Sequence, residues 1–384
     1  MTSGDNARLQ TQDWERDRVS LITKSIATYS PSGQEKGMAT LLFEELVCAG
    51  LSPRIDGAGN VICEVGSGRR SILLCGHMDT VPGELPVVHE GDVIRGRGAC
   101  DAKGPLMSLL FAFEDLAKRR DLISIGRVIF AGVTEEERTS AGLRELIKQG
   151  IRADYAIFGE PCGLSKITIG YRGHLPTLIR VETESSHGSA PSLSTNSAEV
   201  AFEVYFKLRD RTWPKRSKED RGNSVEDVSV SLTEIHGGSA HNVTPASTEI
   251  TLDIRLPFGV SVESAKEAVE SSLEEVRRKQ KGARIIAQFD DPTEAYRARL
   301  DSDLVRSLSR ALLRSPSKVR PSYIEKSGTG DMNTYASTFG IQAVTYGPGD
   351  TKLSHTSEER VSVGEILECS KILVETVEEL FRIA

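Results

Sequence analysis

The chain has 384 residues, of which 38% are hydrophobic and 27% are charged, and its formal net charge is −7. This length is large for a single hydrophobic core and predicts two domains in an ordinary globular protein. The acidic balance argues against a general affinity for nucleic acid or for a bilayer surface. No apolar run approaches the ~20 residues of a membrane-spanning helix, and no signal segment is expected in the polar start.

The cysteines are scattered, without closely spaced pairs: Cys48, Cys63, Cys75, Cys100, Cys162 and Cys369. In a chain of this size, such cysteines are typical of reduced thiols with mostly structural roles. We therefore expect a cytoplasmic protein.

Strands and helices alternate in the first 160 residues. Helices are expected at Trp14–Ala27, around Met38–Ala49 and at Leu106–Lys118, with a short loop or hairpin at Val87–Ile94. Apolar runs predict strands at Val61–Val65, Ser71–His77, Gly126–Val133 and Asp154–Gly159. This alternation predicts an α/β sheet, in which ligands bind beyond the carboxyl ends of the strands.

Residues that can bind metals follow these strands. His77 and Asp79 end one strand, and the aspartate could orient the imidazole, although a lone histidine is more often an ordinary polar residue. Glu135–Glu137 and Glu160 follow two further strands. Asp101 precedes a helix, where an N-cap is the simpler interpretation. We expect these side chains to converge on one rim of the sheet.

The pattern changes after Gly170. Alternating strands and amphipathic helices appear in the order strand, helix, two strands, helix, strand, which predicts a ferredoxin-like unit. The strands are expected at Pro176–Glu182, Val228–Ile235, Ser247–Leu256 and Ala283–Phe289, and the helices at Ser197–Arg209 and Val262–Arg278. The first pattern then returns, with a helix at Leu304–Leu313, a strand at Ile341–Tyr346 and a helix at Val363–Ile383.

A late histidine, His355, completes a set of two imidazoles and several carboxylates that suits two zinc-like ions. Asp101 is the natural bridge between the ions, and Glu136 is placed to move protons. By composition alone, scattered surface acids and histidines are an equally good interpretation.

Four motifs in order resemble the M20 metallopeptidase family over almost the whole chain: Gly76–Pro82, Gly96–Gly104, the Glu135–Glu137 run and His355. The resemblance implies a zinc-peptidase-like α/β catalytic domain (1–171 and 291–384) with an inserted ferredoxin-like α+β lid and dimerisation domain (172–290).

The resemblance also implies roles for the site residues. His77 and Glu160 would hold one metal, Glu137 and His355 the other, and Asp101 would bridge them. Asp79 would orient His77, and Glu136 would be the catalytic base. The family usually shows Asp-Glu-Glu where this chain has three glutamates, so Glu135–Glu136 is an alternative working pair.

Further matches lie in the expected lid and near the metals. Ser186–Pro191 resembles a lid motif whose histidine, here His187, stabilises the oxyanion, often across a dimer; an ordinary loop histidine is the alternative. Asn242 and Arg255 resemble binders of a substrate carboxylate. Gly328 and Thr329 belong to a run, Ser327–Asp331, that resembles the substrate-binding loop.

Three details resemble a subgroup that releases lysine or ornithine from an amino-group carrier protein: Asp101–Pro105, Gly328–Asn333, and Tyr346–Asp350 followed by His355–Glu359. The resemblance implies a homodimeric di-zinc amidohydrolase of lysine or arginine biosynthesis, with Co²⁺ or Mn²⁺ as possible substitutes. Its substrate would be a small acidic carrier, cut after the terminal glutamate. Basic runs that could meet this carrier are Lys207, Arg209, Arg211, Lys215 and Arg216, and Arg277, Arg278, Lys279 and Lys281, although such runs are usually solvated faces.

Two alternatives stay open. The first is a small-molecule enzyme, either a deacetylase for N-acetylornithine or N-acetyllysine or a related deacylase or dipeptidase, because the amide chemistry is identical. The second is a metal-binding protein that has lost catalysis. The presence of Glu136 and His187 argues against the second.

Overall fold

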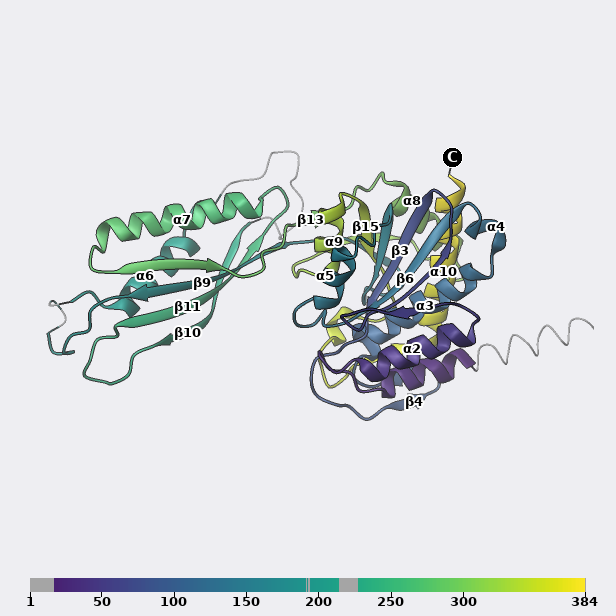
Figure 1. Ribbon diagram of the computed structural model, residues 1–384, viewed down its shortest axis with the longest axis horizontal. Coiled ribbons are helices and arrows are strands. Elements are labelled where there is room, and N and C mark those ends of the chain that lie inside the picture. Colours follow the sequence, from purple (N-terminus) through teal and green to yellow (C-terminus); the bar gives the residue numbers. More distant parts are fainter. Residues whose placement is uncertain (1–16, 191, 193, 214–226, 384) are drawn as a thin grey trace, which may run out of the picture. The chain divides into compact units, whose positions relative to one another are not determined.

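The computed structural model describes residues 17–383, apart from 191, 193 and 214–226 (Figure 1). The start of the helix expected from Trp14, Pro191 of the lid motif, and the basic residues Lys215 and Arg216 lie outside the described residues. In the described part of the chain, no helix is long and apolar enough to cross a membrane.

Contacts divide the described chain into two compact units. Unit 1 holds the residues up to Ile169, Ala298–Ile324 and those from Gly330 onward, and unit 2 holds Gly170–Arg297 and Glu325–Thr329. The expected boundaries lay at 171/172 and 290/291, and the assignment of 325–329 to unit 2 was not expected. The roles of the two parts as catalytic domain and lid remain predictions.

A nine-stranded sheet forms the centre of unit 1, in the order β1-β2-β6-β3-β7-β15-β8-β13 with β14 paired to β8. Its central strands are parallel: β6 (Gly126–Val133), β3 (Arg70–His77), β7 (Tyr155–Gly159) and β15 (Gln342–Thr345). Every residue of β3 after Arg70 is buried, as expected for a strand covered on both faces. The outer strands are β1 (Arg54–Ile55), β2 (Val61–Gly66), β8 (Lys166–Tyr171), β13 (Tyr296–Arg297) and β14 (Ser322–Lys326).

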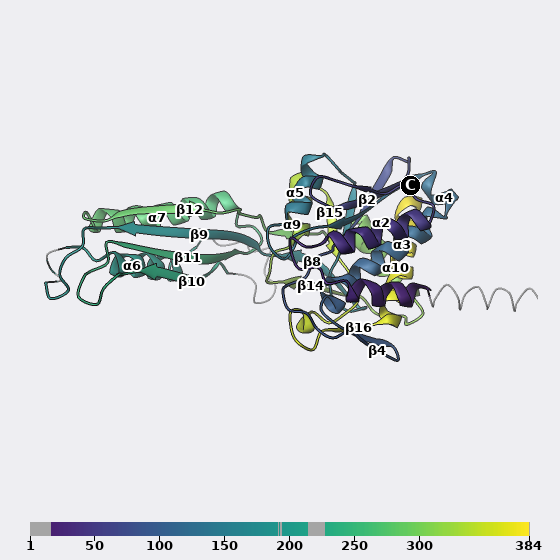
Figure 2. The ribbon, with the colours of Figure 1, turned by 60° about the horizontal axis from the view of Figure 1, so that its bottom comes forward.

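Helices cover both faces of this sheet (Figure 2). On one face, Leu109 of α3 (Gly104–Ala117) packs over Gly159, and α3 packs against α10 (Val363–Arg382). Phe158 precedes Gly159 and therefore points to the opposite face, where its ring lies 5.8 Å from that of Tyr335 in α9 (Asp331–Phe339). The other helices are residues 17–27, α2 (Lys36–Cys48), α4 (Arg120–Ile123), α5 (Ala141–Lys148) and α8 (Asp303–Arg314).

The strands and long helices predicted for unit 1 are confirmed within a few residues. The expected hairpin is β4 (Val88–Glu90) paired with β5 (Val93–Arg95), and β16 (Arg360–Ser362) adds a third strand. The helices α5 and α9 and the strands β8 and β14 were not predicted. α9 gives a weak signal because much of its sequence, DMNTYASTF, is polar and lacks a regular apolar stripe.

Unit 2 has the predicted ferredoxin-like topology. Its antiparallel sheet has the order β10-β11-β9-β12, formed by β9 (Gly173–Glu182), β10 (Ser229–Gly237), β11 (Ser247–Leu256) and β12 (Arg284–Phe289). The helices α6 (Ser197–Arg209) and α7 (Val262–Lys279) pack against each other, and both contact β9. Alternate residues of β11 are buried, including Ile250, Leu252 and Ile254, so one sheet face forms the core with the helices.

The loop that follows β6 is closed by Asn60. The side-chain amide of Asn60 donates to the carbonyl oxygen of Gly142 over 2.9 Å, and its Oδ1 accepts from the N–H of Thr134 over 3.1 Å. A Cβ on Gly142 would lie only 2.4 Å from Asn60 Oδ1 and from the backbone nitrogen of Thr134. The two ends of the loop that holds Glu135–Glu137 therefore meet where only glycine fits.

We expect Gly142→Ala to reduce the free energy of unfolding by about 1–3 kcal/mol, because buried backbone atoms would have to move apart. Urea unfolding measures this change. Gly57→Ala is the matched control, since no heavy atom lies within 4 Å of its Cβ position. An unfolding free energy for Gly142→Ala equal to that of the control would show that the loop closure is not tight.

Candidate metal centre and active site

Three neighbouring parallel strands end at the same edge of the unit 1 sheet. His77 at the end of β3 pairs with Val133 at the end of β6, and Gly159 at the end of β7 pairs with Gly76. The Glu135–Glu137 run follows β6, and Glu160 follows β7 directly. The strand register therefore brings these side chains to one place.

The first candidate ligand group consists of His77, Asp101 and Glu160. His77 Nε2 lies 3.4 Å from Asp101 Oδ1 and 3.6 Å from Glu160 Oε1. This nitrogen is buried and has no hydrogen-bond partner among the described residues. A buried imidazole nitrogen that faces two carboxylates in this way fits a metal ligand.

The second candidate group consists of Asp101, Glu137 and His355. His355 Nε2 lies 2.8 Å from Glu137 Oε1 and 3.4 Å from Asp101 Oδ2. Asp101 thus turns one oxygen to each group, which is the arrangement of a bridging carboxylate. Glu135 is absent from both groups, and its Oε2 accepts from Thr139 Oγ1 over 2.6 Å instead.

Asp79 connects the two strand ends. Its buried carboxylate accepts from the N–H groups of Glu136 and Glu137, each over 3.1 Å, and from Ser32 Oγ over 2.7 Å. Its Oδ1 also lies 3.3 Å from His77 Nδ1. Burial opposes the ionised form, but the contacts with His77 and these donors outweigh it and lower the pKa of Asp79.

Negative charge is concentrated at this site. Burial, and next the Glu160 carboxylate, raise the pKa of Glu136 well above its usual value, and burial also raises the pKa of Glu137. A hydrogen bond to Asp101 raises the pKa of His355 to about 9, against partial burial. The protein alone would therefore hold protons here, and divalent cations would supply the missing positive charge.

Two buried acids near the candidate ligands escaped the sequence analysis as site residues. Asp331 begins α9, and burial raises its pKa to about 6. Glu359 accepts hydrogen bonds from the turn that carries Asp101. Their positions at the ends of two quoted motifs, Ser327–Asp331 and His355–Glu359, could have drawn attention to them.

The residues expected in the lid lie in unit 2. The segment of His187 lies beside that of Asn242, because Gly188 N–H donates to the Asn242 carbonyl oxygen over 2.7 Å. The exposed imidazole of His187 lies 2.7 Å from Ser189 Oγ. Arg255 binds Asp253 through two nitrogens, and its Nη1 donates to Thr329 Oγ1 over 3.0 Å. At Gly328, no heavy atom lies within 4 Å of the Cβ position.

The described basic residues of unit 2 are largely paired with acids. Lys207 lies 2.5 Å from Glu275, and Arg277 lies 2.5 Å from Glu274. Arg209 binds Asp210, its neighbour in sequence. This pairing favours a solvated charged face over a surface reserved for an acidic partner.

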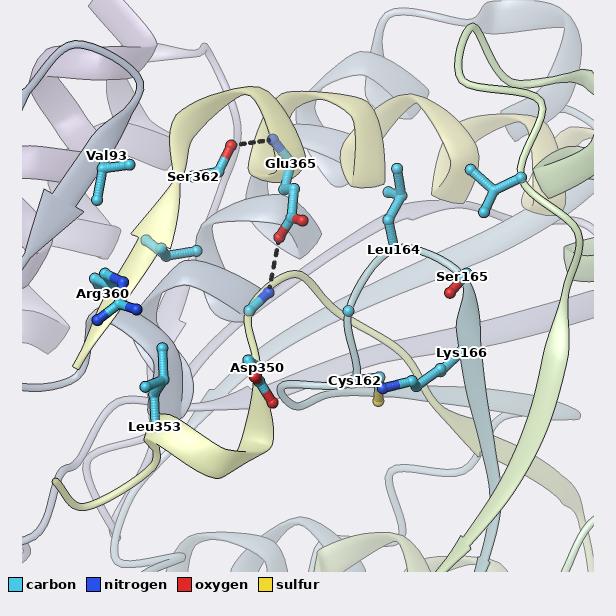
Figure 3. Close-up of a pocket in the computed structure, with 14 residues that line it drawn as sticks. Val93, Cys162, Leu164, Ser165, Lys166, Asp350, Leu353, Arg360, Ser362 and Glu365 are labelled. Carbon is cyan, nitrogen blue, oxygen red and sulfur yellow. Dashed lines mark hydrogen bonds between the residues drawn. The ribbon is translucent and has the colours of Figure 1, made fainter. Parts of the chain in front are cut away.

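A pocket of about 560 Å³ lies elsewhere in unit 1 (Figure 3). Lys166 and Arg360 contribute cations to its lining, and Asp350 and Glu365 contribute carboxylates. Glu365 accepts from the N–H of Gly349 over 3.2 Å. None of the predicted site residues is among the residues that line this pocket.

Known proteins are similar to this chain in sequence and in fold. A protein from Thermococcus kodakarensis with the name "Putative [LysW]-lysine/[LysW]-ornithine hydrolase" is 34% identical over 95% of this chain and 92% of its own. A [LysW]-lysine hydrolase from Deinococcus radiodurans is 33% identical over 90% of this chain and 92% of its own.

Solved structures show the fold. The metallo-carboxypeptidase Sso-CP2 of the M20 family from Sulfolobus solfataricus has a TM-score of 0.75 at 20% identity, covering 96% of this chain and all of its own. The YXEP protein of Bacillus subtilis, a dinuclear metal-binding M20 peptidase, has a TM-score of 0.74 at 16% identity. The match covers 95% of this chain and 98% of the YXEP chain. Residues 73–379 match the family profile itself, and the chain therefore belongs to peptidase family M20/M25/M40.

Proposed function

We propose that this metal-dependent amide hydrolase releases lysine or ornithine from the carrier protein LysW. The observation that carries the hydrolytic part is Asp101, whose two oxygens face two separate ligand groups. The relatives that are named as LysW-lysine or LysW-ornithine hydrolases, at 29–36% identity, support the substrate.

His77 and Glu160 would hold one ion, Glu137 and His355 the other, and Asp101 both. Zn²⁺ suits these nitrogen and oxygen ligands, and Co²⁺ or Mn²⁺ could replace it. When bound, such ions polarise a carbonyl group and make water more acidic. Asp79 would orient His77 and hold the backbone of Glu137 in place.

Glu136 would act as the general base. It would take a proton from the attacking water as the new C–O bond forms at the amide carbonyl carbon. It would then deliver this proton to the leaving nitrogen as the C–N bond breaks, giving the free amino acid and the carboxyl group of the carrier, which then ionises by losing the second proton of the water. The raised pKa of this buried carboxyl supports a role that alternates between both protonation states.

Unit 2 would act as the lid. His187 would stabilise the oxyanion, and Asn242 and Arg255 would bind the substrate carboxylate together with Gly328 and Thr329. The bidentate pair with Asp253 and the bond to Thr329 support a fixed orientation of the Arg255 guanidinium. The free thiols of the described cysteines suit a reducing compartment, in line with the expected cytoplasmic location.

A homodimer would form through unit 2. Among the described strands, the outer strand β10 pairs with β11 alone, and the neighbouring helix α6 exposes Phe202 and Phe206, whose rings lie 6.2 Å apart. Strand edges and exposed aromatic pairs favour association with a second copy.

We expect Glu136→Gln to lower kcat by at least about 100-fold, because the amide can neither accept nor return the proton. Metal content, measured by inductively coupled plasma spectrometry, should stay unchanged. Glu135→Gln is the matched control, since Glu135 contacts Thr139 rather than the ligand groups. Equal losses in the two variants would remove Glu136 from this role.

Carrier-linked lysine and carrier-linked ornithine should be cleaved with a kcat/KM at least about tenfold above that for N-acetylornithine, N-acetyllysine and dipeptides. The reason is that a carrier offers contacts beyond the scissile amide. Amine release by the zinc-loaded protein measures these rates side by side. A preference for the acetylated amino acids would identify a small-molecule deacetylase instead.

The double substitution Phe202→Glu and Phe206→Glu should raise the dimer dissociation constant at least about tenfold, because it places charge on the apolar face of α6. Analytical ultracentrifugation measures this change. Leu313→Glu, at an exposed position of α8 in unit 1, is the control. A wild-type chain that is monomeric at assay concentrations would refute the dimer.

A further inference from the structure

Glu359 contacts the backbone of the candidate bridging residue. It lies four residues after His355, and its side chain is only 1% exposed. Its Oε1 accepts from the N–H of Cys100 over 3.1 Å and from the N–H of Asp101 over 2.8 Å. Because the Asp101 side chain serves both ligand groups, the backbone position that Glu359 fixes affects both.

Arg97 uses the second oxygen of Glu359. Its Nη1 donates to Glu359 Oε2 over 2.8 Å, and its side chain is 11% exposed. The same guanidinium donates to the carbonyl oxygens of Thr356, over 3.3 Å, and Gly83, over 2.9 Å. Arg97 thereby fastens the segment next to His355 to the turn that carries Asp101, and its planar fork suits these divergent bonds.

The pair is electrostatically balanced. A carboxylate as buried as Glu359 would be costly without partners, and here two N–H groups and one guanidinium compensate it. A glutamine at this position could still accept from the two N–H groups. It would lose the ionic contact and would turn an amide or a weaker acceptor toward Arg97, so Glu359→Gln tests the charge with little change of shape.

We propose that Glu359 and Arg97 are positioning residues for the metal held by Asp101, Glu137 and His355, an inference that rests on the proposed two-metal function. In that group, the pair bonds the backbone of Asp101 and of Thr356, the residue that follows His355. In the group of His77 and Glu160, it fixes only Asp101. Disruption of the pair should therefore weaken one metal site more than the other.

Titration of the metal-free protein with Co²⁺ tests this inference without substrate, by calorimetry and by visible absorption. His355→Ala and Glu160→Ala assign the two binding steps. We expect Glu359→Gln and Arg97→Lys to raise the dissociation constant of the step that His355→Ala removes by at least about tenfold, and to change the other step less. Excess metal should restore kcat while KM stays as in the wild type.

Glu358→Gln is the matched control, because the Glu358 side chain is 68% exposed and its ion contacts with Arg95 and Arg360 are as long as 3.9 Å. Thermal unfolding of the metal-free variants separates a loss of stability from a loss of metal affinity. If Glu359→Gln lowers the unfolding temperature, the test uses Arg97→Lys, which keeps the positive charge. Unchanged affinity, or equal weakening of both steps, would overturn the inference. A failure to cleave carrier conjugates would challenge only the proposed substrate, since the titration uses no substrate.

Discussion

The site depends on one buried carboxylate, Asp79, at the junction of β3 with the loop that follows β6. Two backbone N–H groups of that loop, from Glu136 and Glu137, and the imidazole of His77 all meet its oxygens. Parallel pairing alone would bring the two strand ends within reach, but it would leave the loop free to turn its side chains elsewhere. Asp79 fixes that loop beside His77, so the candidate base Glu136 and the candidate ligand Glu137 are held next to the candidate ligand that ends the neighbouring strand.

This arrangement requires uncommon backbone conformations around the ligands. Glu135, Ser140 and His355 have φ values of 56°, 51° and 65°, in the left-handed region that side chains other than glycine rarely adopt. Hydrogen bonds from neighbouring groups hold two of these residues, because Glu135 N–H donates to Glu35 Oε1 over 3.0 Å and Ser140 N–H to the Glu135 carbonyl oxygen over 2.6 Å. The loops are thus held by the surrounding structure against their local preferences.

The sequence was informative where a periodic pattern or a strand end marked a residue. Buried runs predicted the parallel strands, and the groups that follow them lie together because parallel strands share one edge. The strict alternation in β11 likewise predicted the unit 2 sheet. Residues whose importance comes from tertiary contacts gave no such signal. Arg97, Glu359 and Asn60 act on segments far away in the chain, and α9 has too weak an apolar stripe to be seen.

Glu359 and Asp79 hold candidate ligands in the same way. Each is a buried carboxylate that accepts the N–H of a candidate ligand and the N–H of the residue before it: Asp101 and Cys100 for Glu359, Glu137 and Glu136 for Asp79. Holding a ligand by its backbone leaves both oxygens of its side chain free for cations. It also places a second layer of negative charge behind the candidate ligands. His77 faces Asp79, Arg97 faces Glu359, and the charge of the buried Lys103 interacts with both carboxylates. Precise placement of acidic ligands therefore calls for further buried acids. The negative charge of this cluster exceeds the positive charge of the side chains around it, and bound divalent ions would compensate the difference and stabilise the cluster as a unit.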